Sequence, residues 1–115
     1  MRRELTRRRV LTATQLLQQA HGNRVRACGL VTMRQRPMTA SGTLFLTLED
    51  ETGSVNVVLW PHIWERQRAV VLHAPLLAVD GVLESDGDVQ HLIGARLHDY
   101  SQLADGLETR SRDFR

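Results

Sequence analysis

The alternation of apolar and polar positions predicts mainly β-structure from residue 24 onward. Five segments of alternating or β-branched composition stand between turn-forming residues, and we expect strands over 24–34, 43–49, 54–60, 76–84 and 89–97. Residues 50–53 and 85–88 contain Gly and Asp in the spacing of tight hairpin turns. Gly29, in the middle of the first strand, indicates a bulge or a sharp bend.

Two helices are also expected, one before the first strand and one after the third. Thr12 or Thr14 can cap a short helix over 13–20, which 21–23 would end because glycine and asparagine tolerate the left-handed cap conformation. Pro61 suits the first turn of a helix that runs to about Val71. Around these elements we expect a basic flexible lead over 1–10, an N-terminal helical segment over 11–22, an exposed loop over 35–42 and a tail over 101–115, with one more helical turn over 101–107.

The order of the expected elements points to one fold class. Three strands, a helix and two further strands within 23–100 match the five-stranded Greek-key barrel called the OB-fold, an all-β architecture. A β-sandwich would contain about seven strands and no helix between the third and fourth. We therefore predict one OB-fold domain, preceded by a short N-terminal helix.

Composition narrows the class of protein. The 115 residues suffice for one domain, and the apolar runs are too short for a membrane span or a signal peptide. The single cysteine, Cys28, excludes an internal disulfide and a cysteine-based zinc site. We expect a cytoplasmic protein without a membrane partner.

Charge is unevenly distributed along the chain. All 15 basic residues are arginines; residues 1–36 hold nine of them against one acid, and 37–115 hold six against twelve acids. Such asymmetry is typical of a surface that meets phosphate. The alternative is that the arginine-only composition reflects a GC-rich coding bias.

The second and third strands predict a binding face. Leu44, Leu46 and Leu48 share one face and would fill the barrel interior, so Phe45 and Thr47 point outward. The same phasing turns three third-strand residues inward (Val55, Val57 and Leu59) and three outward (Asn56, Val58 and Trp60). An outward aromatic beside small polar groups can stack on a nucleobase. Alternatively, Phe45 is covered by the N-terminal helix or the tail.

Other aromatic and basic residues have both a binding and a structural interpretation. Trp60 either faces the ligand or packs under the following helix, and Trp64 is expected in the core or on the helix face. Arg34 and Arg36 flank the start of the loop after the first strand, which borders the binding groove in OB-folds, unless they are solvated loop arginines. The remaining candidates are Arg24 and Arg26. They lie on the same side of the first strand as Arg34 if no bulge intervenes.

No pattern indicates catalysis or a cofactor. The five histidines have no metal-ligand spacing, and the acidic run 49–51 is better explained as a turn in which Asp50 bonds the local backbone. There is no glycine-rich phosphate loop and no serine elbow. We predict that this chain alone is not an enzyme and needs neither metal nor cofactor.

The chain resembles a known family at Val31-Thr32-Met33-Arg34-Gln35-Arg36-Pro37, at 45–61 and at 111–114. These segments are similar to the C-terminal region of the error-prone bacterial C-family DNA polymerases, paralogues of the polymerase III alpha subunit. The resemblance implies an OB-fold that handles single-stranded DNA near the template during translesion synthesis, without the polymerase's catalytic domain. Met38 and Ser41 stand where the family commonly has glycine and lysine, which removes one phosphate contact.

The resemblance carries roles onto particular residues. Arg34, Gln35 and Arg36 match the family's loop, and Phe45 matches the outward aromatic that related OB domains stack on bases. With Thr47, Asn56, Arg24, Arg26 and Trp60 they form the predicted nucleic-acid-binding set. The expected function is single-stranded DNA binding within an error-prone polymerase. Two alternatives remain, namely a module that recruits mutasome or clamp subunits and an anticodon-type RNA-binding domain.

Overall fold

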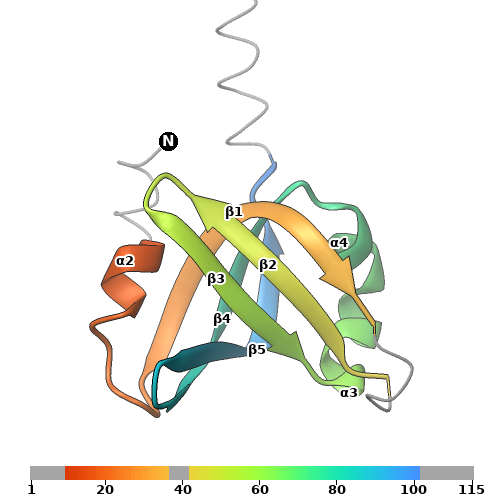
Figure 1. Ribbon diagram of the computed structural model, residues 1–115. Coiled ribbons are helices and arrows are strands. Elements are labelled where there is room, and N and C mark those ends of the chain that lie inside the picture. The colour runs from red at the N-terminus through yellow and green to blue at the C-terminus, as the bar shows by residue number, and fades with distance from the viewer. Residues whose placement is uncertain (1–9, 37–41, 102–115) are drawn as a thin grey trace, which may run out of the picture.

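The computed structural model describes residues 10–36 and 42–101, and its strands form a closed barrel (Figure 1). The strand order around the barrel is β1-β2-β3-β5-β4. The strands are β1 (Arg24–Gln35), β2 (Leu44–Asp50), β3 (Gly53–Leu59), β4 (Leu76–Asp86) and β5 (Val89–Asp99). The predicted five-stranded OB-fold, with a helical segment between β3 and β4, is confirmed.

Several expectations concern residues that the structure does not describe. The basic lead, most of the 35–42 loop and nearly all of the C-terminal tail with its helical turn lie outside the described ranges. Within those ranges, no helix has the length and apolar character that a membrane crossing needs.

The N-terminal helix α2 (Ala13–Leu16) is shorter than the predicted 13–20. Its cap is Thr12, which forms a reciprocal capping box with Gln15: the Thr12 hydroxyl accepts from the Gln15 amide and the Gln15 side chain accepts from the Thr12 amide. The bonds after Leu16 reach back only three residues, as from Gln18 to Gln15, so the α-helical pattern tightens and ends.

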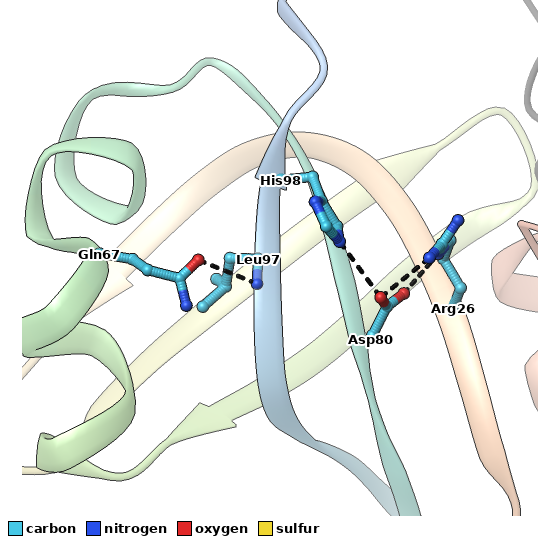
Figure 2. Close-up of polar contacts among 5 residues, drawn as sticks. All are labelled: Arg26, Gln67, Asp80, Leu97 and His98. Carbon is cyan, nitrogen blue, oxygen red and sulfur yellow. Dashed lines mark hydrogen bonds and ion pairs between the residues drawn. The ribbon is translucent and has the colours of Figure 1, made fainter.

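The predicted helix after Pro61 is divided into three short pieces, α3 (Pro61–Trp64), η1 (Glu65–Gln67) and α4 (Arg68–His73). The backbone leaves the helical region at Gln67, which has φ −122° and ψ 36°. This break lets the Gln67 side-chain oxygen accept a hydrogen bond from the Leu97 amide of β5 at 3.2 Å (Figure 2). This hydrogen bond links the helical segment to β5 of the barrel.

Strand β1 belongs to two parts of the barrel wall. Its first half pairs with β4 and its second half with β2, and Leu30 takes part in both ladders. Gly29 lies at this transition, where an added Cβ would be only 2.7 Å from the Glu49 carbonyl oxygen. The glycine therefore permits the close approach of β1 to β2, whereas the bulge itself lies further on, between Val31 and Met33.

The barrel interior confirms the predicted phase of β2. Leu44, Leu46 and Leu48 are almost completely buried, while Phe45 and Thr47 are only partly buried. In β3 the inward positions Val57 and Leu59 are fully buried. Burying such side chains stabilises a fold by about 1.5–3 kcal/mol each.

Val58 departs from the predicted exposure of the outer face. The phasing of β3 places it in solvent with Asn56 and Trp60, but it is only 7% exposed. In the sheet it pairs with Phe45 of β2 on one side and Ile93 of β5 on the other. Two large neighbours explain its burial, and the parallel contact with β5 that provides one of them is not visible in the local sequence.

Asp50 joins the turn after β2 to the N-terminal helix. Its carboxylate accepts hydrogen bonds from the Thr52 amide and hydroxyl, from the Gly53 amide and from the Ala13 amide at the start of α2. Burial alone would raise the pKa of this carboxyl, but the hydrogen bonds, led by those of Thr52, outweigh it and lower the pKa below its ordinary value. The expected role of Asp50 in the turn is confirmed and extends to a distant element.

Replacing Asp50 with alanine should lower the free energy of unfolding by about 1–2 kcal/mol at neutral pH, because several amides lose an ionised acceptor at a partly solvated site. A lowered native-state pKa stabilises the fold above the carboxyl's ordinary pKa, and this contribution disappears as pH falls through the native-state value. Urea denaturation should therefore show a difference from the parent that narrows in acid. Glu49→Ala, an exposed neighbour, is the control, and an equal loss there would contradict the assignment.

Candidate nucleic-acid interface

A shallow groove of about 390 Å³ lies on the outer face of β2 and β3. Phe45 and Thr47 from β2 and Asn56 from β3 line it, as do Met33 and Gln35 from the second half of β1. Thr47 is the ladder partner of both Met33 and Asn56, and Phe45 is the partner of Gln35. Four predicted site residues therefore meet in one concavity: Gln35, Phe45, Thr47 and Asn56.

The groove combines an aromatic ring with uncharged polar groups. Phe45 is half-buried, so its side chain is supported by the sheet while part of it remains accessible. Gln35, Asn56 and Thr47 provide both hydrogen-bond donors and acceptors around it. A flat apolar surface surrounded by such groups can hold an unstacked base and bond its edge.

Besides the buried Leu46 and Val57, which the phasing had placed in the barrel interior, two lining residues were not predicted from the sequence. Met33 is 50% exposed and comes opposite Thr47 only because of the β1 bulge. His91 reaches the groove from β5, which lies beside β3 through the short parallel pairing of Val57 with Leu92 and of Val58 with Ile93. The local sequence contains no signal for either contact, since one depends on a bulge position and the other on a crossover.

Trp60 lies at the end of β3 but does not line this groove. It forms the N-cap of α3 in an extended conformation and is 45% exposed. It therefore does not pack under the helix. Trp64 takes that place instead, with 1% exposure, as expected for a core residue.

Arg34 is directed toward the helical segment. Its Nε donates to the Val71 carbonyl at 2.9 Å and its Nη2 to the Ala74 carbonyl at 2.8 Å, which satisfies carbonyl groups at the end of α4. A guanidinium has five N–H donors, so these two bonds do not exhaust it. Arg34 thus has a structural task in addition to its positive charge.

Both ends of the β1–β2 loop are held by Trp64. The Arg36 guanidinium lies over the indole ring at 5.6 Å, and the indole Nε1 donates to the Gly42 carbonyl at 2.8 Å. Arg68 of α4 lies over the same ring at 5.3 Å. These contacts bring two exposed guanidiniums together beside the loop, at one end of the barrel.

Arg24 and Arg26 are on the half of β1 that pairs with β4, and they do not line the groove. The bulge between Val31 and Met33 breaks the alternation that would have placed them on one side with Arg34. Figure 2 shows Arg26 bonded to Asp80 through two guanidinium nitrogens, with His98 Nε2 3.2 Å from the same carboxylate. The Arg26 hydrogen bonds hold the pKa of Asp80 below its ordinary value despite partial burial.

The described residues contain no group of three or more metal-ligating side chains. The candidate site combines the Phe45 ring, the amide and hydroxyl groups around it and the nearby arginines. Such a surface can bind by stacking, hydrogen bonding and charge attraction.

Comparison with known families defines the class of this domain. Residues 25–100 match the family model described as "OB-fold nucleic acid binding domain", which covers every strand but the first residue of β1. The chain therefore belongs to the OB-fold nucleic-acid-binding domain family.

Curated relatives give a more specific likeness. The chain is 56% identical over its whole length to a segment of an error-prone DNA polymerase from Pseudomonas fluorescens, and 51% identical over 99% of its length to one from Pseudomonas aeruginosa. It spans 11% of the length of each relative. The resemblance to the error-prone polymerases is thus confirmed at the level of this segment.

Solved structures support the fold alone. An asparaginyl-tRNA synthetase from Pyrococcus horikoshii superposes with a TM-score of 0.64 at 18% identity, over 79% of this chain and 22% of that chain. The p204 HINb domain gives the same TM-score at 20% identity, over 82% of this chain and 48% of that chain.

Proposed function

We propose that this domain binds single-stranded DNA in the groove of Phe45, Thr47 and Asn56, as one part of an error-prone polymerase that copies damaged templates. The observation that carries the proposal is the half-buried Phe45 ring within a concavity lined by Gln35, Thr47 and Asn56. An unpaired base can stack on this ring, whereas a base inside a duplex cannot reach it. The role in mutagenic synthesis is drawn from the name of the curated relatives.

The arginines beside the β1–β2 loop are positioned to contact the phosphates of a single DNA strand where it leaves the groove. Arg36 and Arg68 share the Trp64 ring at one end of the barrel, and the exposed Arg34 bonds the end of α4 beside them. Phosphates that leave the groove in this direction would pass exposed guanidiniums. In this proposal, base contacts and phosphate contacts are made by separate groups of residues. The phosphate contacts should make the affinity depend on salt, whereas the base contacts should not.

Fluorescence anisotropy with labelled oligo-dT tests the proposal directly. If two phosphates are neutralised, the affinity should fall about sevenfold between about 50 and 200 mM salt, since counterions are released from a single strand. A hairpin duplex should bind more weakly than oligo-dT at equal salt, because its bases are stacked internally. Oligo-U is the comparison for an RNA-binding role. An affinity that is independent of salt, or a clear preference for oligo-U or duplex, would contradict the proposal.

A further inference from the structure

A second and larger hollow, of about 810 Å³, lies on the outer face of β1, β4 and β5. In the strand order of the barrel, β4 stands between β5 and β1, across the barrel from β2 and β3. The hollow shares no lining residue with the Phe45 groove. We call it the β4 hollow, and the residues of interest in it are Leu11, Arg24, Asp80, Val82, Ala95 and Arg96.

An irregularity in the β4–β5 ladder opens the β4 hollow. The register shifts between Asp80 and Gly81, which leaves Ala95 without a ladder partner. Gly81 has no side chain and Ala95 has one carbon, so neither fills the space above the sheet. Leu11, which is bridged to β1 beside Ala27, and the exposed Val82 supply apolar walls.

The charges in the β4 hollow are unbalanced. Among the described residues that line it, Asp80 is the single carboxylate, and Arg26 and His98 already bond that group. Arg24 lies opposite Val82 on β1, and Arg96 lies opposite Asp80 on β5. Both are exposed, and the described residues offer neither of them an ion pair or hydrogen bond. These two exposed arginines, on the two strands that flank β4, are left available for external anions beside the apolar side chains of Leu11 and Val82.

We propose that the β4 hollow binds an acidic peptide segment, with carboxylates on Arg24 and Arg96 and an aliphatic side chain against Leu11 and Val82. Guanidinium forks pair with carboxylates in a bidentate manner, and a peptide that alternates acidic and aliphatic residues supplies both carboxylates and apolar side chains to such a surface. The part of the lining that the structure describes contains no aromatic ring on which an unpaired base could stack, in contrast to the groove at Phe45. A protein partner fits this surface better than a second nucleic-acid strand.

NMR titration of the folded chain with a short peptide of alternating glutamate and leucine tests the proposal. Amide shifts should move at Val82, Ala95 and Arg96 and stay unchanged at Phe45 and Asn56. The double variant Arg24→Glu/Arg96→Glu should lose at least about tenfold in affinity for the peptide. Arg66→Glu, an exposed arginine outside the hollow, should change it by less than about twofold.

Further arms separate specific binding from its alternatives. A peptide with glutamine in place of glutamate should bind at least about tenfold more weakly. Oligo-dT should not displace the acidic peptide. The double variant should bind oligo-dT as tightly as the parent does. Circular dichroism confirms that the variants are folded. Equal losses in Arg66→Glu and the double variant, or displacement of the peptide by oligo-dT, would overturn the proposal. The peptide tests the β4 hollow and oligo-dT tests the Phe45 groove, so a negative result with the peptide does not affect the test of DNA binding.

Discussion

Gly81→Ala is expected to lower the free energy of unfolding by about 3 kcal/mol or more. A Cβ at Gly81 would lie 2.1 Å from the Ile93 carbonyl oxygen and 3.0 Å from the Gly94 Cα. The three nearest atoms all belong to the backbone of β5, so no side-chain rotation can relieve the overlap with them. The strands would have to separate at the irregularity that joins β4 to β5.

Two companion variants make this prediction specific. Gly94→Ala would place a Cβ 2.4 Å from Leu59 Cδ2 and 3.1 Å from Val79 Cγ1, which are side-chain atoms that can shift, so the loss should be smaller. Glu84→Ala, at an exposed position of β4, should change stability by no more than about 0.5 kcal/mol. Urea denaturation of all three variants measures their free energies of unfolding and so ranks the three losses. A Gly81→Ala protein as stable as the Glu84→Ala protein would contradict the close backbone contact.

The sequence predicts those parts of the fold that depend on short-range pattern. Three leucines at every second position define the inner face of β2, and the Asp50 turn is recognisable from its residue types alone. Once the inner face is known, Phe45 and Thr47 must lie outside, and pairing with β3 adds Asn56. The centre of the groove therefore follows from the order of residues in two neighbouring strands.

The remaining part of the site depends on contacts that no local pattern encodes. The bulge in β1 changes which residues of that strand share a face, so Arg24 and Arg26 are separated from the groove while Met33 joins it. Arg34 finds its carbonyl partners in α4, which lies 37 residues away in sequence at Val71. His91 arrives through a parallel pairing between strands that are not consecutive. Each of these features is a property of the closed barrel and not of a segment.

The sequence also could not separate two kinds of arginine. Nine arginines in the first 36 residues suggest one basic surface, yet the described ones have different partners. Arg34 bonds helix carbonyls, Arg36 lies over Trp64, and Arg26 is paired with Asp80. A net charge therefore marks a chain as basic without showing which charges face a ligand. The structure places Arg34 and Arg36 beside the helical segment and Arg24 and Arg26 on the part of the wall where β1 pairs with β4.

Phe45→Ala is expected to weaken oligo-dT binding by about 2 kcal/mol, or roughly thirtyfold, because a stacked base contributes about 1–3 kcal/mol. Of the described residues that line the groove, Phe45 alone has an aromatic carbocycle, and His91 provides an imidazole ring. Removing it takes away the flat apolar surface while Thr47 and Asn56 remain. Anisotropy titration at constant salt measures the loss, and the slope of affinity against salt should stay unchanged, since no phosphate contact is altered.

Phe45→Leu separates stacking from packing. Leucine keeps an apolar side chain against Val58 and should preserve most of the stability, but it offers no ring face to a base. If stacking is the source of affinity, Phe45→Leu should bind oligo-dT nearly as weakly as Phe45→Ala, while Leu30→Ala, which shortens a 52% exposed apolar side chain outside the groove, should bind like the parent. Parent-like affinity of Phe45→Leu would show that only apolar bulk matters at this position. Parent-like affinity of Phe45→Ala would remove the ring from the interface and, with it, the physical basis for binding an unpaired strand on this face.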